Sequence, residues 1–258
     1  MSDVVLKEQE GRVVILTINR PDKLNALNQQ VRDDMLSHLD EIETDDSVGV
    51  VVLTGAGDKS FIAGADIGEF AGRSPFDQRH DMRQPRIFDV MSSFPKPVIA
   101  MINGFCLGGG NEVMASCDLR VASEKARFGQ PEINLGLIPG GGGTQRLPRL
   151  IGPGQTMRLV LTGDMISADE AKEIGLVEMV VAHEELREKT LDLATKIASK
   201  SPLTLKVAKE AVRASQRLAI EEGILYERDL FCLCFSSEDK QEGVAAFLEK
   251  RSPEWVGR

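Results

Sequence analysis

Two glutamates that each follow a glycine-containing turn are the residues of this sequence with the clearest potential for chemistry. Glu112 comes two residues after the glycine run 108–110, and Glu132 follows Gly129-Gln130-Pro131. Two carboxyl groups that share one pocket can serve as a general base and a general acid. The alternative is that both are solvated surface charges, as most glutamates are.

The glycine run before Glu112 predicts a set of uncovered backbone donors. The apolar run 97–102 has the composition of a strand, and the residues after the glycines, which include Val113 and Met114, have a helical pattern. Glycines at the start of a helix leave its N–H groups open to a ligand. A nucleotide-binding P-loop is excluded, because no Lys-Ser/Thr pair follows the glycines. A backbone donor beside a carboxylate suits carbonyl chemistry, in which the donor holds an oxyanion and the carboxylate moves a proton.

The composition is that of an ordinary globular protein, with 42% hydrophobic and 28% charged residues. The net charge of −9 argues against a nucleic-acid surface, which needs a basic patch. No apolar run reaches the roughly 20 residues that span a bilayer, and residues 1–10 lack the features of a signal peptide. The cysteines have no metal or redox spacing, so we interpret them as reduced packing residues of a cytoplasmic protein. They are Cys106, Cys117, Cys232 and Cys234.

Apolar runs and helical patterns alternate along the first part of the chain and predict an α/β fold. Strands are expected where β-branched residues cluster and end at turn residues. One helix between the first two strands has an apolar face, because its apolar residues recur every three or four positions. That face consists of Val31, Met35, Leu39 and Ile42. The expected strands are residues 13–18, 48–53, 98–102, 118–122 and 176–181, which form a recurring β-β-α pattern.

The chain after His183 is predicted to be helical, with breaks at Ser201-Pro202 and Ser236-Ser237. A capping box at 167–170 opens a short helix before it, and residues 67–94 are expected to be helical but irregular. The C-terminal helices carry more apolar residues than a peripheral tail can bury, which indicates self-association. These residues are Leu225, Leu230, Phe231, Phe235, Val244 and Phe247.

Motifs along nearly the whole chain resemble those of the crotonase (enoyl-CoA hydratase) superfamily, and enoyl-CoA hydratases in particular. The resemblance includes segment 103–147, which holds both glutamates, and further motifs in the order in which the family has them. These are Asn19-Arg-Pro-Asp-Lys-Leu-Asn-Ala-Leu27, Phe61-Ile-Ala-Gly-Ala-Asp-Ile67, Leu161-Thr-Gly-Asp164, Ala168-x-x-Ala-x-x-x-Gly-Leu-Val177 and Glu238-Asp-x-x-Glu-Gly-x-x-Ala-Phe-x-Glu-Lys-Arg251. Because the family hosts several reactions, the residues of the site have to decide the function.

The resemblance implies a crotonase-like α/β spiral of repeated β-β-α units over residues 1–200, which holds the CoA-thioester site. It also implies a helical oligomerisation region over residues 201–258, which would assemble a homotrimer or homohexamer. The implied reaction is the reversible syn addition of water to a trans-2-enoyl-CoA. Acyl-CoA is then the only expected small-molecule partner, with no metal, no separate cofactor, no nucleic acid and no membrane.

Residue by residue, the resemblance makes Glu112 the base that activates water and Glu132 the carrier of the C2 proton. The backbone N–H groups of Ala65 and Gly109 would form the oxyanion hole, and both lie in small-residue turns where backbone approaches a ligand closely. Without the flanking motifs, residues 63–66 would be interpreted as an ordinary turn. The other implied substrate contacts are Ala26, Ala63, Gly64, Asp66, Ile67 and Gly140.

Three assignments stay open at the level of the sequence. Residues 140–143 are either a phosphate cradle or, as the missing P-loop context favours, a tight turn against the acyl chain with a helix beginning one or two residues later. Lys23, with Arg20, is either a contact for the CoA phosphates or a solvated residue. Lys250 has the same two interpretations and could contact a ligand bound to a neighbouring subunit. His38, His80 and His183 have no partner at metal or triad spacing and receive no role.

Other functions are compatible with the fold. An enoyl-CoA isomerase of the family can work with one catalytic carboxylate, so the presence of both Glu112 and Glu132 favours the hydratase. RNA binding, which at least one family member shows, is disfavoured by the net charge of −9. A purely structural oligomer would leave the two carboxyl groups and the glycine turns unexplained.

Overall fold

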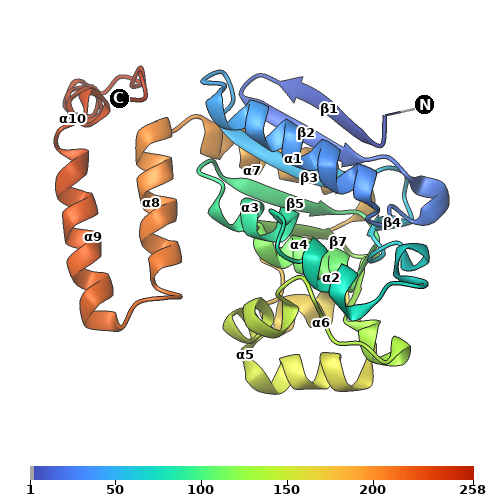
Figure 1. Cartoon of the computed structure of the whole chain (residues 1–258). Helices are drawn as coiled ribbons and strands as arrows, with labels where there is room; N and C mark the ends of the chain where they lie inside the picture. Colours follow the sequence, from blue (N-terminus) through green and yellow to red (C-terminus); the bar gives the residue numbers. More distant parts are fainter. Residues whose placement is uncertain (1–2) are drawn as a thin grey trace.

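Two β-sheets covered by helices form the centre of the structure (Figure 1). The computed structural model describes residues 3–258 of the chain. The strands are β1 (Val5–Glu10), β2 (Val13–Ile18), β3 (Val50–Gly55), β4 (Ser60–Ile62), β5 (Val98–Ile102), β6 (Phe105–Leu107), β7 (Leu119–Ser123), β8 (Arg127–Gly129), β9 (Met165–Ser167) and β10 (Met179–Val181).

The helices include short 3₁₀ segments, which are labelled η. The first half of the chain has η1 (Pro21–Lys23), α1 (Gln29–Thr44), η2 (Ile67–Phe70), α2 (Pro75–Asp81), α3 (Ile87–Ser93), α4 (Gly109–Ser116) and η3 (Pro131–Leu135). The second half has α5 (Gly143–Thr162), α6 (Ala168–Glu173), η4 (His183–Glu185), α7 (Leu186–Ala198), α8 (Pro202–Ala214), α9 (Ile220–Cys234) and α10 (Glu238–Glu249).

The two sheets are built from strands that alternate along the chain. The six-stranded sheet has the order β1-β2-β3-β5-β7-β10, and the four-stranded sheet has the order β4-β6-β8-β9. Each of the strands β3, β5 and β7 lies in the first sheet and is followed by a strand of the second sheet and then by helices. Neighbouring strands are parallel except in the pairs β1–β2 and β8–β9. This repetition confirms the predicted spiral of β-β-α units.

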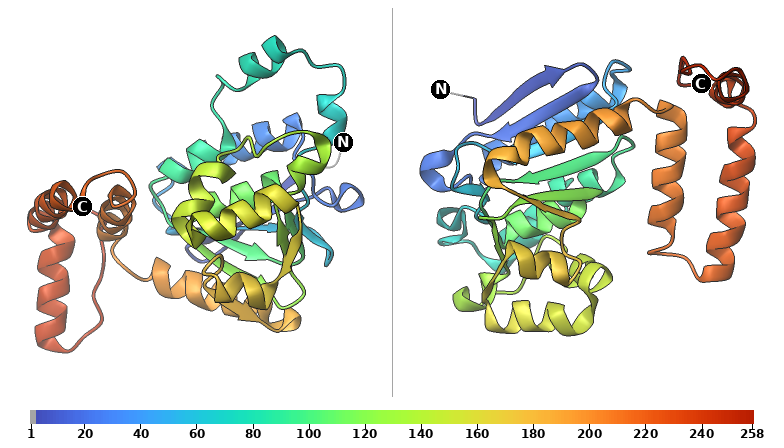
Figure 2. Two further views of the ribbon diagram at one scale, coloured as in Figure 1. Left: turned by 90° about the horizontal axis from the view of Figure 1, so that it is seen from below. Right: turned by 180° about the vertical axis from the view of Figure 1, so that it is seen from behind.

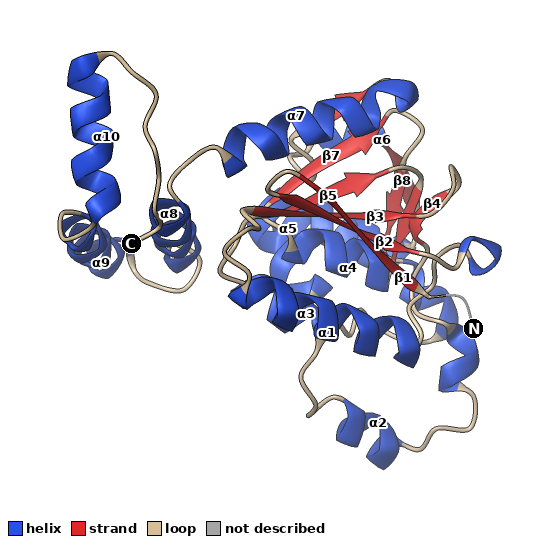
Figure 3. Ribbon diagram, turned by 90° about the horizontal axis from the view of Figure 1, so that it is seen from above, coloured by secondary structure: helices blue, strands red, loops and turns tan. Residues whose placement is uncertain are grey.

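The larger sheet is buried on both faces, which is why its central strands β2, β3 and β5 are rich in apolar residues. Side chains alternate along a strand, so Val14 and Leu16 of β2 pack in the core that contains α1, whereas Val13 and Ile15 pack against α7. In Figure 3, α7 lies on one side of this sheet, and α1, α3 and α4 lie on the other. Helix α4, which carries residues of the site, therefore packs against the hydrophobic core on this face of the sheet.

Most of the elements expected from the sequence are present. Strands β2 and β5 occupy the predicted residues, and the predicted apolar face of α1 is buried. The predicted strands 48–53, 118–122 and 176–181 appear as the slightly shifted β3, β7 and β10. The expected direct step from β5 into the glycine turn is wrong, because β6 lies between them. Strand β6 has only three residues and exists through its pairing with β4 and β8, so no local pattern marks it.

The C-terminal helices α8, α9 and α10 extend to one side of the sheets (Figure 2). The predicted breaks are present, since α8 begins at Pro202 and α10 begins after Ser237. Helix α8 is tied to the core at Asp118, whose carboxylate lies 2.6 Å from Lys209 Nζ and 2.8 Å from Arg213 Nη2. Most of the predicted apolar set is exposed in the single chain, with Phe247 82% exposed, whereas Leu230 is buried. The predicted division of the chain into a spiral core, residues 1–200, and an oligomerisation region, residues 201–258, stays a prediction.

All four cysteines are free; Cys106 and Cys117 are buried as predicted, whereas Cys232 is exposed in the single chain. Across residues 3–258, none of the helices combines the length and the apolar character that crossing a membrane requires.

Close contact between α4 and β4 generates a prediction on stability. A Cβ atom at Gly110 would lie 1.9 Å from the backbone oxygen of Ile62, so Gly110→Ala must push the two elements apart. We expect Gly110→Ala to lower the free energy of unfolding by about 1–3 kcal/mol, measured as a lower urea midpoint at fixed protein concentration. The matched control is Gly223→Ala in α9, where a new Cβ meets nothing within 4 Å. Equal midpoints for the two variants would contradict the close packing.

Candidate active site

Glu112 lies in the first turn of α4, and its side chain is buried although it carries a carboxyl group. Gly108 precedes the helix with φ 51° and lets the chain turn sharply from β6 into α4. Glu112 is 3% exposed, and its Oε1 atom accepts hydrogen bonds from Gly141 N at 2.6 Å and Gly143 N at 2.7 Å. A buried carboxylate requires such donors. The second glycine cluster, residues 140–143, therefore holds Glu112 in place.

This contact decides between the two interpretations of residues 140–143 and agrees with the favoured one, a tight turn. Their N–H groups at Gly141 and Gly143 are engaged by a protein carboxylate, which contradicts a phosphate cradle. Helix α5 begins at Gly143, one residue before the expected range. The sequence interpretation missed that Gly141 and Gly143 donate to Glu112. Four successive glycines could have indicated it, because backbone N–H groups without side chains beside them are available as donors.

Opposing effects act on the pKa of Glu112. Burial raises its pKa above 4.5, because the charged form loses solvation. The hydrogen bonds from Gly143 and Gly141 lower the pKa, and so do the positive charges of Arg86 and Arg146. The site thus provides specific donors and cations that stabilise the ionised form of this carboxyl group against the effect of burial.

Glu132 lies close to the same end of α4 but in a different environment. It belongs to η3, and a Cβ atom at Gly108 would lie 3.1 Å from its Oε1 atom. Burial, and to a smaller extent the negative charge of Glu112, together raise the pKa of Glu132 to about 7. The structure thus brings the two predicted carboxyl groups together. It also gives them different proton affinities, as an acid–base pair requires.

Gln130 is a site residue that the sequence interpretation missed. It is fully buried, and with its amide nitrogen turned toward Glu132 that atom lies 3.0 Å from both carboxyl oxygens. An amide can donate to a carboxylate or accept from a carboxylic acid, so Gln130 suits both protonation states of Glu132. Its position two residues before the glutamate was the only available signal.

The two predicted oxyanion donors lie side by side. A Cβ atom at Gly109 would lie 3.5 Å from Ala65 N. Gly109 is the first residue of α4, so its N–H has no acceptor within the helix. Around Ala65, the parallel bridge to Leu27 uses the neighbours Gly64 O and Asp66 N, which leaves the Ala65 N–H directed away from Leu27. The two predicted donors therefore lie close to each other at the N-terminal end of α4, the helix that carries Glu112.

Several other predicted contacts surround Ala65. Arg20 Nη2 donates to Asp66 at 2.9 Å, and its Nη1 atom donates to Ala26 O at 2.6 Å. This hydrogen bond from Arg20 is the main cause of the lowered pKa of Asp66. Arg20 therefore binds the loop that carries Ala65. The interpretation of Arg20 as a solvated surface residue is wrong, because its side chain is 15% exposed and paired with Asp66, and its contact with the CoA phosphates stays a prediction. Ala63, Gly64 and Ile67 lie in that loop beside Ala65, whereas Gly140 lies at the Glu112 turn.

The two predicted lysine contacts lie at different distances from this site. Lys23 is exposed on η1, close in sequence to the Ala26 loop. Lys250 is exposed directly after α10, and α10 lies among the C-terminal helices, away from α4 (Figure 1). Within one chain Lys250 does not join the carboxyl groups. Both phosphate contacts stay predictions.

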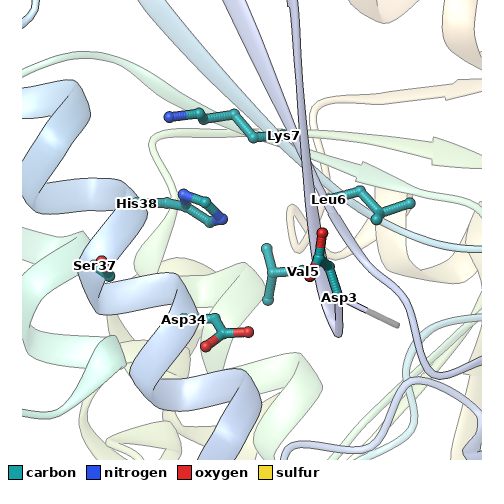
Figure 4. A pocket seen from close by; sticks show the side chains of 7 residues that line it. All are labelled: Asp3, Val5, Leu6, Lys7, Asp34, Ser37 and His38. Carbon is teal, nitrogen blue, oxygen red and sulfur yellow. The ribbon is translucent and has the colours of Figure 1, made fainter. Parts of the chain in front are cut away.

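Other polar groupings do not belong to this site. His183 Nδ1 lies 2.9 Å from the buried Ser123 Oγ, a contact between η4 and β7 that the sequence did not indicate. In the described part of the chain, no three His, Cys, Asp or Glu side chains are arranged to hold a metal ion. A groove between β1 and α1 includes no residue of the carboxyl site (Figure 4). Its lining consists of Asp3, Val5, Leu6, Lys7, Asp34, Ser37 and His38.

Comparison with known proteins connects this geometry to one family. The family described as enoyl-CoA hydratase/isomerase matches residues 8–258. A short-chain-enoyl-CoA hydratase of Clostridium acetobutylicum is 46% identical over 251 residues, which cover 97% of this chain and 96% of that protein. A 2,3-dehydroadipyl-CoA hydratase of Escherichia coli is 43% identical over 258 residues and covers 100% of both chains. Among solved structures, an enoyl-CoA hydratase from Bacillus anthracis superposes with a TM-score of 0.94 at 41% identity, covering 99% of this chain and 100% of that one.

The raised pKa of Glu132 predicts how stability depends on pH. The folded protein keeps this proton up to about pH 7, whereas the unfolded chain releases it near the ordinary value of 4.5. The native state therefore binds more protons between these values, so this group makes stability fall as the pH rises through that window. We expect the urea midpoint of the unmodified protein to fall more between about pH 5 and about pH 8 than that of Glu132→Gln.

Glu184→Gln, a change at an exposed residue of η4, is the control for this comparison. It should keep the pH dependence of the unmodified protein. Identical pH dependence in Glu132→Gln and the unmodified protein would contradict the raised pKa.

Proposed function

Since the chain belongs to the enoyl-CoA hydratase/isomerase family, we propose that it adds water reversibly to trans-2-enoyl-CoA thioesters. The observation that carries this proposal is the pair of unlike carboxyl groups. Glu112 is held by two N–H donors, and Glu132 has a pKa of about 7. Hydration requires one group to take a proton from water and one to deliver a proton to carbon. The hydratase activities of relatives 43–46% identical over nearly the full chain support the same reaction.

In the proposed mechanism, the thioester oxygen accepts hydrogen bonds from the N–H groups of Ala65 and Gly109. Glu112 removes a proton from water while the water oxygen forms a bond to C3. The π electrons of the C2–C3 double bond move onto the thioester and form an enolate, whose oxyanion is held by the two donors. Glu132 then delivers its proton to C2. Proton exchange with solvent returns Glu112 and Glu132 to their starting states.

Both carboxyl groups lie against the N-terminal end of α4, so addition of oxygen and hydrogen to one face of the double bond is the expected stereochemistry. CoA enters as part of the substrate in this scheme, and no other cofactor takes part.

The acyl chain would lie between residues 67–94 and 133–140, where Phe76, Met82, Leu135 and Ile138 are exposed apolar side chains. Lys23 would contact the CoA phosphates. Lys250 would reach them from a neighbouring copy of the chain.

We propose that the C-terminal helices assemble the chain into a homotrimer or homohexamer. The exposure of Phe247, Leu248 and Phe231 in the single chain supports this, because monomeric proteins rarely leave a large apolar patch open. Isologous or ring-forming contacts would bury such a patch. We also propose that the protein is cytoplasmic, which its four free cysteines support.

The roles of the two glutamates are tested by near-isosteric substitution. We expect Glu112→Gln and Glu132→Gln each to lower kcat on the order of 10²–10⁴-fold, the range for general acid–base groups. The measurement is the loss of absorbance of crotonyl-CoA at its conjugated thioester band. A variant that keeps more than half of the activity would remove its residue from the mechanism. An enzyme that only isomerises a double bond would tolerate the loss of Glu112.

The assembly is tested by light scattering on the intact protein. We expect a mass that is a multiple of three chains of 28.2 kDa, and we expect the double variant Phe247→Asp, Leu248→Asp to reduce that mass. Charged side chains buried in an apolar contact without partners are strongly unfavourable. A stable monomer of the unmodified protein would contradict the proposed assembly.

A further inference from the structure

The peptide bond between Gly140 and Gly141 is held from both sides. Its N–H group, which belongs to Gly141, donates to Glu112 Oε1 at 2.6 Å. Its carbonyl oxygen, which belongs to Gly140, accepts a hydrogen bond from Arg86 Nη1. Because a peptide unit is planar, a guanidinium that fixes the carbonyl also fixes the direction of the N–H. Hydrogen bonds in such a chain polarise one another and become stronger.

The second donor to Glu112 is secured in a different way. The peptide that carries the Gly143 N–H has its carbonyl on Gly142, and this oxygen accepts from the backbone N–H groups of Gln145 at 2.9 Å and Arg146 at 2.8 Å. The first turn of α5 therefore holds that peptide. Among the described residues, the Gly140 carbonyl has only the Arg86 side chain as a hydrogen-bond partner. The peptide that carries the Gly141 N–H is thus held at its carbonyl by Arg86, while the carbonyl of the next peptide, on Gly141, accepts from Arg146 Nη1 at 2.7 Å.

Arg86 comes from the segment that faces the second glycine cluster. It precedes α3, and its guanidinium lies 4.9 Å from the ring centroid of the buried Phe88. A Cβ atom at Gly141 would lie 2.7 Å from Phe88 Cζ and 2.6 Å from Glu112 Oε2, so the aromatic ring, the turn and the carboxylate are in contact. A residue with a Cβ atom therefore cannot replace Gly141 without displacing Phe88 or Glu112, and the Arg86 guanidinium packs over the Phe88 ring beside this turn.

We propose that Arg86 is a positioning residue for Glu112, which orients the Gly140–Gly141 peptide so that its N–H holds the carboxylate that activates water. The inference rests on the proposed function, since it assigns Arg86 a role only through Glu112. The proposed role of Arg86 also connects the segment that borders the acyl chain with the catalytic base. Arg86 lies within residues 67–94, the segment expected to border the acyl chain, so this segment helps to orient the base.

The charges around Glu112 support this role. Arg86 precedes α3, Arg146 belongs to α5, and Glu132 belongs to η3. These three groups interact electrostatically with Glu112. The charge of Arg86 lowers the pKa of Glu112 against the effect of burial. Removal of Arg86 should therefore raise the pKa of the base. The acidic limb of the pH profile of kcat/KM should then move to higher pH.

The first part of the test compares three substitutions in the full-length protein. Arg86→Met keeps the aliphatic stem but removes the donors, and we expect it to lower kcat for crotonyl-CoA about 10- to 100-fold with little change in KM. Arg86→Lys keeps one cationic donor and should recover part of the loss. Arg149→Met is the matched control, because among residues 3–258 the Arg149 side chain forms a hydrogen bond only with the Gln145 carbonyl of its own helix. Unchanged kcat in Arg86→Met would overturn the inference.

The second part is a double-mutant cycle, which separates positioning of Glu112 from a general effect on structure. If Arg86 acts through Glu112, Arg86→Met should cost less than about threefold in kcat when Glu112→Gln is already present. An equal loss in both backgrounds would overturn the inference. So would an unshifted acidic limb in Arg86→Met. If Arg86→Met does not fold, as judged by circular dichroism and oligomer size, Arg86→Gln takes its place in the cycle.

The same measurements distinguish a failure of this inference from a failure of the proposed function. High activity in Glu112→Gln alone would remove Glu112 as the base, and the role of Arg86 would fall with it. Low activity in Glu112→Gln with full activity in Arg86→Met would overturn only the role of Arg86. The expected result is a loss in both single variants and a much smaller additional loss in the double variant.

Discussion

The burial of the Glu112 carboxylate is the constraint on which the rest of the site depends. A carboxyl group that is 3% exposed is stable in its ionised form only if donors replace the lost water. Those donors are the N–H groups of Gly141 and Gly143, about thirty residues away in sequence. The start of α4 and the start of α5 must therefore lie together. The second glycine cluster is required to bring backbone, without side chains, against the acid.

The alternation of strands between two sheets is what makes this contact possible. Each β-β-α unit returns the chain to the same edge, so α4, η3 and α5 all begin near one another. Gly108 turns the chain from β6 into α4, and Gly110 lets α4 lie against Ile62 of β4. The oxyanion donors Ala65 and Gly109 meet for the same reason, because the segment after β4 runs past the start of α4. Position in the repeat, rather than local sequence, creates the site.

The two glutamates show how one pocket separates two proton affinities. Both are affected by burial, which raises the pKa of each. Glu112 is also bound by two N–H donors and lies near two arginines, which oppose that effect. At Glu132, burial and the negative charge of Glu112 act in the same direction, and the pKa reaches about 7. The difference between base and acid thus follows from hydrogen bonds and charge, although the residue type is the same.

The sequence by itself determined the strands β2 and β5, the buried face of α1, the breaks before α8 and α10, and the glutamates and glycine turns of the site. These features are local: periodicity marks a buried face, and glycine or capping residues mark where an element begins. Only the tertiary structure decided that Gly141 and Gly143 bind Glu112, that Gln130 accompanies Glu132, and that Arg20 binds Asp66. The short strand β6 also appears only through its partners. Contacts between residues far apart in sequence depend on how the units stack, and no spacing within one segment reports that stacking.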